Sequence, residues 1–435
     1  MEDEGLIRAV GVRGLTASIV NYTVGAGIFV LPAVVAARIG GAAVIAYVVC
    51  AVAMGLIVLC FAQAGSRVSL SGGVYAYAGT VFGPYVGFLV AVMLWFGANV
   101  LASATVANIF IGALAQLIPA AADPIVRGVI LVALYALLAV INMRGVKIGI
   151  HVVEGFAIAK LAPLVILIVV GVFAVQAANF SWPGMPSAGE ISRTSAMLIF
   201  AFLGVESALT PSGEVRDPAR TVPRAVFLAL ALVTVLYLAI QMVAQGILGA
   251  SLATNTAAPL AAAARLSIGR AGELLVIAGT AISTFGYVAG DMLAAPRAIY
   301  ALARDGLLPS AIAKVHPVRR TPTVAIVIHA IACCAFAVTG SFEGLLVLAT
   351  LATLLVYLAC CFAAFELRRR DIRTGEGTPF RIPGGPVVPI IASAVVVWLM
   401  SSATRAEFIA LGWMVLVSTL LFLVMRVAGR RGSSA

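Results

Sequence analysis

The sequence has 435 residues, of which 63% are apolar and only 10% are charged, whereas a soluble domain carries about 25% charged residues. A soluble fold cannot bury so much apolar surface, but a lipid bilayer can surround it, so we predict a membrane protein. The net charge of +11 does not indicate nucleic-acid binding, because the basic residues lie in short loops between apolar runs, as in loops that face anionic lipid.

Apolar runs recur along the whole chain, each close to the length of about 20 residues that crosses a bilayer. They predict an all-α, polytopic membrane protein with about 12 transmembrane helices in a single domain, residues 1–435. The predicted spans are residues 11–37, 41–64, 84–117, 125–143, 152–176, 194–214, 223–248, 271–302, 323–340, 344–366, 386–403 and 407–427.

The distribution of Lys and Arg predicts the orientation. With the N-terminus inside the cell, the predicted inner loops and ends hold 21 of these residues and the outer loops hold 6. Because positive charge accumulates on the cytoplasmic side, we expect both termini there.

Spans 1 and 6 are predicted to be broken helices. Span 1 contains Gly25-Ala-Gly-Ile-Phe-Val-Leu-Pro32 and span 6 contains Gly204-Val-Glu-Ser-Ala-Leu-Thr-Pro211, with the same glycine-to-proline spacing. Interrupted helices at corresponding positions of two halves indicate the binding site of a transporter. The halves would be residues 11–176 and 194–366, each with five spans, followed by two additional helices in residues 386–427. Five is an odd number, so the second repeat must be inverted.

A helix break frees backbone groups that a substrate can bind. A half-helix that starts at the first break would direct N–H groups and a positive dipole end toward a carboxylate. These N–H groups belong to Gly25, Ala26 and Gly27. Freed carbonyls suit an ammonium group, and they are expected near Thr23, Phe200 and Leu203. The two breaks together fit a zwitterion such as the backbone of an α-amino acid.

Three motifs carry a family resemblance. The segment from Phe202 to Arg224, FLGVESALTPSGEVRDPARTVPR, resembles span 6 and the following loop of the amino acid–polyamine–organocation (APC) superfamily. Gly25-Ala-Gly-Ile-Phe resembles the span 1 motif of that superfamily, and Arg304-Asp-Gly-Leu-Leu-Pro309 resembles its loop after span 8. The resemblance implies an inverted-repeat fold shared with sodium-coupled amino-acid transporters, and amino acids or their amines as substrates.

The resemblance also implies roles for single residues. Thr23, Ala26 and Gly27 match positions that hold the substrate carboxylate and amine, although the arginine–agmatine exchanger of the superfamily has a serine in place of Ala26. Phe200 matches an aromatic gate, and its alternative role is plain helix packing. Asn99 matches a pocket-lining asparagine of span 3, and its alternative role is an interhelical hydrogen bond.

Glu206 and Asp291 are the two acidic candidates. Glu206 lies just past the break in span 6 and matches a glutamate near the gate; a charge within the membrane is functional by default, although the residue could also cap the second half-helix. Asp291 falls where the arginine–agmatine exchanger has a pocket tryptophan, which argues against arginine or agmatine as substrate. The alternative for Asp291 is a salt bridge to Arg297.

Lys160 lies about eight residues into span 5, roughly 12 Å at 1.5 Å per residue, so its ammonium could reach the surface only by extending fully. The resemblance instead implies that the ammonium occupies the cavity between spans 1, 5 and 8 where sodium-coupled relatives hold a cation. At ~4 Å and an effective dielectric of about 20, a second cation there would be repelled by about 4 kcal/mol, so sodium-independent transport is expected. Proton-coupled members and obligatory exchangers both carry this lysine.

Several motifs are absent. The chain has no GxxxxGK[ST] sequence for ATP, and His151, His316 and His329 are scattered without metal-binding spacing. The cysteines lie in apolar runs as packing residues. We therefore expect no enzyme activity, no cofactor, no metal and no nucleic-acid partner.

The sequence thus predicts a secondary-active amino-acid transporter of the cytoplasmic membrane that works by alternating access, sodium-independent and proton-coupled. Obligatory exchange is the alternative mechanism, and a non-transporting membrane sensor is the alternative of another class. The oligomeric state and the identity of the substrate stay open.

Overall fold

The computed structural model describes residues 10–68, 73–144, 160–180, 184–208, 215–319, 321–374 and 378–432. Over these ranges most of the chain is helical, and its only β-type pairing is an isolated bridge between Val10 and Val215. Seven helical segments in these ranges are long and apolar enough to cross a membrane, and shorter apolar helices accompany them. The predicted all-α membrane fold is confirmed.

The first predicted repeat contains broken and continuous helices. Its helices are α1 (Val12–Thr23), α2 (Gly27–Ile39), α3 (Ala43–Arg67), α4 (Val74–Phe82), α5 (Pro84–Met93), the π-helical segment η2 (Leu94–Leu101), α6 (Ala102–Ala115), α7 (Pro124–Arg144) and α9 (Ala162–Gly171). Short 3-10 turns link them: η1 (Gly40–Ala42), η3 (Pro119–Ala122), η4 (Val172–Ala174) and η5 (Ala177–Phe180). The first part of predicted span 5, residues 152–159, lies outside the described residues.

The second predicted repeat and the C-terminal part follow. Their helices are α10 (Ala188–Ile199), η6 (Phe200–Phe202), α11 (Val205–Ala208), α12 (Pro218–Leu248), η8 (Gly249–Ala253), α13 (Pro259–Ile268), α14 (Arg270–Arg304), η9 (Ser310–Ala313), α15 (Thr323–Thr339), α16 (Phe342–Arg369), α17 (Val387–Met400) and α18 (Arg405–Gly432). The end of predicted span 6, residues 209–214, lies outside the described residues. The short helices α4 and α13 lie between predicted spans and were not predicted.

The breaks in spans 1 and 6 are confirmed. Helix α1 ends at Thr23 and α2 begins at Gly27, while α10 and η6 end before a turn at Leu203 and Gly204, and α11 begins at Val205. Gly204 has φ +125°, a backbone conformation that side chains with a Cβ rarely adopt. A Cβ at Gly204 would also lie 2.7 Å from the carbonyl carbon of Tyr22, so the absent side chain lets the two breaks touch.

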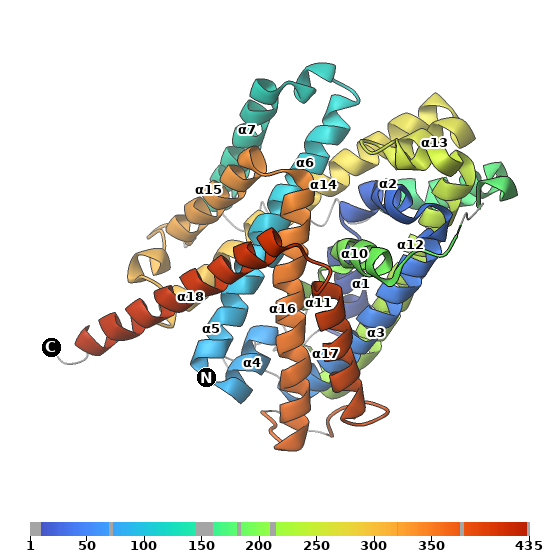
Figure 1. The fold of residues 1–435 in the computed structure, drawn as a ribbon. Helices are drawn as coiled ribbons and strands as arrows, with labels where there is room; N and C mark the ends of the chain where they lie inside the picture. Colours follow the sequence, from blue (N-terminus) through green and yellow to red (C-terminus); the bar gives the residue numbers. More distant parts are fainter. Residues whose placement is uncertain are drawn as a thin grey trace.

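The helices form one bundle around these breaks (Figure 1). Helix α12 packs along α3 and α1, α6 packs against α14 and α15, and α16 contacts both α3 and η2. The C-terminal helix α18 runs along the outside of the bundle and contacts α5 and α16. Large apolar side chains are exposed on α7, α12 and α18, for example Val129, Val235 and Val424, as expected where lipid covers the surface.

Candidate functional site

The two helix breaks meet in the interior of the bundle. Helix α2 packs against η6, and α1 packs against α11. A Cβ at Gly27 would lie 3.2 Å from Phe200 Cδ1 and 3.3 Å from Ala201 Cα. The structure therefore brings two of the predicted site residues, Gly27 and Phe200, into direct proximity, and Phe200 is buried there.

The N-terminus of α2 has no side-chain cap. Its N-cap residue is Ala26, which is buried and offers no side-chain acceptor. The Phe29 N–H donates to the Ala26 carbonyl at 3.1 Å, so the N–H groups of Gly27 and Ile28 are the ones that depend on a partner from elsewhere. The helix dipole places partial positive charge at the same point. A buried, uncapped helix start of this kind can bind a carboxylate.

Carbonyl groups of both breaks converge on one tyrosine. The hydroxyl of Tyr237, from α12, lies 2.9 Å from the carbonyl oxygen of Thr23 and 2.7 Å from that of Ala201. A hydroxyl has one proton to donate, so it satisfies only one of these acceptors fully at a time. The arrangement leaves acceptor capacity for an ammonium group. Tyr237 was not predicted, because nothing in its apolar helix marks it.

Thr23 contributes a second polar atom. Its side-chain oxygen is buried and has no hydrogen-bond partner, whereas its carbonyl also accepts from the Gly25 N–H at 2.7 Å. A buried hydroxyl without a partner is costly, which makes it a candidate for a substrate contact. Leu203 is half-buried, and its N–H donates weakly to the Phe200 carbonyl at 3.4 Å.

Glu206 provides a hydrogen-bond acceptor for a backbone N–H at the break in span 6. Its two carboxylate oxygens lie 3.0 and 3.1 Å from the Gly204 N–H, and the Tyr357 hydroxyl of α16 donates to it at 2.7 Å. The side chain is fully buried. This position matches the predicted alternative of a capping role, and it ties the break in span 6 to α16.

Lys160 lies against the first broken span. Its buried ammonium donates to the carbonyl oxygen of Asn21, two residues before the end of α1. It precedes α9, which packs closely on α14: a Cβ at Gly279 would lie 2.4 Å from Pro163 Cγ. Spans 1, 5 and 8 therefore converge near Lys160.

Asn99 lies in the π-helical segment η2. Its side-chain amide donates to the carbonyl of Leu94 at 3.1 Å, a bond inside the segment and not the interhelical bond considered from sequence. Tyr287 of α14 lies next to this segment, with its hydroxyl 3.5 Å from the carbonyl of Ala98. The ring of Tyr287 also lies near Gly25, where a Cβ would be 3.7 Å from Tyr287 Cδ2. Tyr287 was not predicted.

Asp291 is paired, but not with Arg297. Its carboxylate lies 2.8 Å from Nε2 of His329 in α15, and both side chains are buried. Among the described residues Asp291 forms no ion pair with Lys or Arg, so the predicted alternative of a bridge to Arg297 is wrong. His329 was not predicted as a site residue, since its partner lies 38 residues away on another helix and leaves no local spacing pattern.

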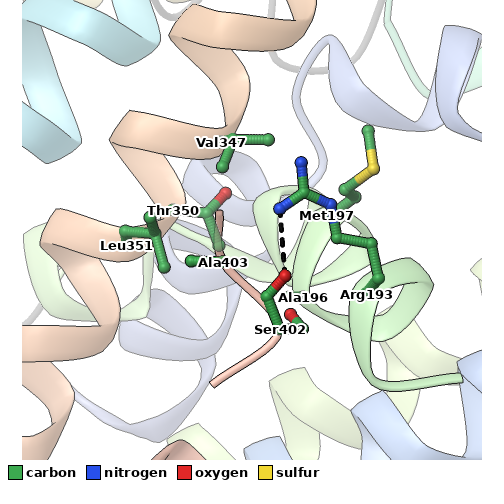
Figure 2. A pocket seen from close by; sticks show the side chains of 8 residues that line it. All are labelled: Arg193, Ala196, Met197, Val347, Thr350, Leu351, Ser402 and Ala403. Carbon is green, nitrogen blue, oxygen red and sulfur yellow. Dashed lines mark hydrogen bonds between the residues drawn. The ribbon is translucent and has the colours of Figure 1, made fainter. Parts of the chain in front are cut away.

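A small pocket lies apart from the breaks (Figure 2). It is formed by α10, α16 and the connection between α17 and α18. Arg193 donates there to the Ser402 carbonyl at 3.2 Å and forms a two-pronged ion pair with Glu407. The pocket contains none of the predicted site residues. Its lining residues are Arg193, Ala196, Met197, Val347, Thr350, Leu351, Ser402 and Ala403.

Comparison with known proteins identifies the family of this chain. A family model described as amino acid permease matches residues 10–425. The chain belongs to the amino acid permease family. The predicted membership of the APC superfamily is thereby confirmed.

Three relatives show the range of this family of permeases. The methylthioribose transporter of Bacillus subtilis (strain 168) is 27% identical over 97% of this chain and 94% of its own length. The serine/threonine exchanger SteT of the same organism is 27% identical over 96% and 95%. The branched-chain amino acid permease BcaP of Lactococcus lactis subsp. cremoris (strain MG1363) is 26% identical over 87% and 86%. The permease is thus similar to transporters along nearly all its length.

Proposed function

We propose that this permease moves an α-amino acid across the cytoplasmic membrane by alternating access, without sodium and together with a proton. The observation that carries the proposal is the meeting of the two breaks. The uncapped start of α2 offers N–H groups to a carboxylate, and the carbonyls of Thr23 and Ala201 share a single hydroxyl donor. An α-amino acid carries a carboxylate for the N–H groups and an ammonium group for the carbonyls.

The inverted repeat supports alternating access. Each half begins with a broken span, and the short helices α4 and α13 each follow the second span of their half. In this proposal residues 11–176 and 194–366 are the repeats, residues 386–427 are additional, and both termini face the cytoplasm because most basic residues then lie inside.

Lys160 supports sodium independence. Its ammonium binds the Asn21 carbonyl beside the break of span 1, so a positive charge already occupies the region between spans 1, 5 and 8. A sodium ion would need oxygen ligands there and would be repelled. Release and recapture of the Lys160 proton would couple transport to protons, whereas a permanently charged Lys160 would fit obligatory exchange.

The test is uptake by the full-length protein in liposomes. A mixture of radiolabelled amino acids is offered first, followed by leucine, serine, threonine and arginine singly, with methylthioribose as a solute that has neither an amino nor a carboxylate group. We expect accumulation of a neutral amino acid. Uptake of methylthioribose alone, or of nothing, would contradict the proposal, and the second result would favour a sensor.

Three gradients separate the coupling mechanisms. We expect an inward proton gradient to drive accumulation and a sodium gradient to have no effect. Uptake that requires an internal amino acid and ignores the proton gradient would establish exchange in place of symport. Uptake that requires sodium would overturn the role of Lys160.

A further inference from the structure

A buried polar cluster lies between α14, α15 and η2, one helical turn beyond Tyr287. Asp291 and Nε2 of His329 are 2.8 Å apart, and the indole N–H of Trp95 in η2 donates to Nδ1 of the same imidazole at 3.2 Å. The side chain of His329 is 0% exposed and that of Asp291 is 3% exposed. These contacts hold both imidazole nitrogens in defined positions.

Trp95 determines where the imidazole proton lies. An indole nitrogen can donate a hydrogen bond but cannot accept one, so Nδ1 of His329 must present its lone pair to Trp95. The imidazole proton is then on Nε2, from which it is donated to the Asp291 carboxylate. A second proton on Nδ1 would face the Trp95 N–H directly, so contact with Trp95 keeps His329 neutral.

With His329 neutral, the ionised pair carries one buried negative charge. No Lys or Arg among the described residues forms an ion pair with Asp291. The titratable groups that face the pair from neighbouring helices are acids that are neutral when protonated, and none supplies a positive charge. They are Tyr22 of α1, Tyr135 of α7, Tyr287 of α14 and Cys333 of α15. An uncompensated charge inside a membrane protein is costly and favours neutralisation by a proton.

A metal ion is the other occupant that this cluster suggests. One ligand atom each of Asp291, His329 and Cys333 lie within 4.8 Å of one another. A histidine that binds a metal through Nε2 carries its proton on Nδ1 and donates it to an acceptor. Trp95 offers a donor at that nitrogen, so the observed contact favours a proton over a metal.

We propose that Asp291 and His329 form a proton-binding site and that Trp95 decides which of the two holds the added proton. While Trp95 contacts Nδ1, the proton binds the Asp291 carboxylate. When Trp95 moves away, the proton binds Nδ1 and gives an imidazolium–carboxylate pair. In both cases one proton from water is added and no other bond changes, so the pair becomes electrically neutral.

The position of Trp95 connects this site to the helix breaks. Trp95 belongs to η2, the π-helical segment that also contains Asn99, and such segments often mark functional sites. Tyr287 is one turn before Asp291 on α14, and it reaches the carbonyl of Ala98 in η2 and the edge of Gly25. A shift of η2 on substrate binding would therefore move Trp95 and alter proton binding.

The test is nitrogen NMR of the full-length permease labelled with ¹⁵N-histidine, in lipid nanodiscs. His329→Gln identifies the His329 signals among those of the three histidines. In the wild-type protein we expect Nδ1 to be unprotonated and Nε2 protonated at pH 8. In Trp95→Phe, which keeps an aromatic ring but removes the indole N–H, the ratio of imidazolium to neutral His329 at pH 6 should rise about tenfold, the factor for one ordinary hydrogen bond.

Each result decides the proposal. A wild-type His329 with its proton on Nδ1, or equal imidazolium ratios in the wild-type and Trp95→Phe proteins, would overturn it. Stoichiometric binding of added Zn²⁺ that disappears in Cys333→Ala would also overturn it in favour of a metal site. The wild-type measurement needs no variant to fold, and because it detects protonation directly, its outcome is separate from that of the transport assays.

Discussion

The two helix breaks of this permease satisfy their freed backbone groups in different ways. At the break in span 6, the Glu206 carboxylate accepts from the Gly204 N–H and from Tyr357, so the chain supplies its own anion. At the break in span 1, Lys160 binds the Asn21 carbonyl, but no side chain caps α2. At the first break a side chain therefore pairs with a backbone acceptor, whereas no side chain pairs with the backbone donors at the start of α2.

This difference indicates which break receives the carboxylate of a substrate. A carboxylate at the second break would lie close to the buried Glu206, and like charges at short distance repel. The same group at the first break would meet the N–H groups at the uncapped start of α2, with the Lys160 ammonium at the Asn21 carbonyl near the end of α1. The ammonium group of a substrate would be favoured toward Glu206 and the shared carbonyls. The orientation of a bound amino acid follows from this asymmetry.

The largest effect on substrate affinity is expected from a side chain at the contact between the breaks. In Gly27→Val, the added atoms meet Phe200 Cδ1 at 3.2 Å and Ala201 Cα at 3.3 Å. Overpacking of this kind costs about 1–3 kcal/mol, so substrate affinity should fall by up to about a hundredfold. Affinity is measured by scintillation proximity with the labelled amino acid that the liposome assay identifies.

The control for this variant is Gly112→Val in α6, where a Cβ would meet nothing within 4 Å. Both variants should elute as folded protein in detergent. A folded Gly27→Val protein with wild-type affinity would show that the substrate does not approach the start of α2.

Removal of the Glu206 carboxylate should destabilise the break in span 6. Glu206→Ala leaves the Gly204 N–H and the Tyr357 hydroxyl without this acceptor, and loss of one partner from a buried charged network costs about 3–5 kcal/mol. The midpoint of thermal unfolding should fall strongly. Glu343→Ala, which removes an exposed partner of Arg38, should change stability by less than about 1 kcal/mol. Equal effects of the two changes would argue against a structural role for Glu206.

An effect of intermediate size is expected for the coupling free energy between Asp291 and His329. The unfolding free energies of Asp291→Asn, His329→Gln and the double variant should be non-additive by about 0.5–3 kcal/mol, because the two side chains are bonded to each other. Asp291→Asn and Arg297→Gln should be additive. A changed preference between cationic and neutral amino acids in Asp291→Asn would instead indicate that the carboxylate faces the substrate.

The smallest effect is expected at Thr23, and it separates binding from stability. Its side-chain oxygen is buried without a partner, so Thr23→Val should leave stability unchanged or raise it slightly. If the hydroxyl binds the substrate, affinity should fall about tenfold, the factor for one hydrogen bond. Thr105→Val in α6, which loses a bond to the Leu101 carbonyl of η2, is the control. Unchanged affinity in Thr23→Val would remove the hydroxyl from the site.

The sequence predicted the features that depend on local patterns. Long apolar runs located the spans, and the spacing of glycine and proline located both breaks. At the break in span 6, Gly204 adopts a backbone conformation that residues with a side chain rarely adopt. The helices α4 and α13 were missed because they are too short to give a membrane-spanning signal.

The contacts that complete the site could not be predicted in this way. Tyr237, Tyr287 and Trp95 lie within apolar helices, and their roles arise from partners that are distant in sequence, such as Thr23 and Ala201 for Tyr237. His329 gave no signal because its carboxylate partner lies on another helix. Spacing rules detect partners on one helix, whereas pairing between helices depends on the packed bundle.

The most direct test is whether the substrate must carry both an α-carboxylate and an α-ammonium group. Uptake of the labelled amino acid into liposomes is challenged with the unlabelled amino acid, its primary amide, which lacks the carboxylate, and its α-hydroxy acid, which lacks the amine. We expect each analogue to compete at least about tenfold more weakly than the amino acid, the factor for one lost hydrogen bond or ion pair. An amide that competes as well as the amino acid itself would show that the N–H groups at the start of α2 do not hold the substrate.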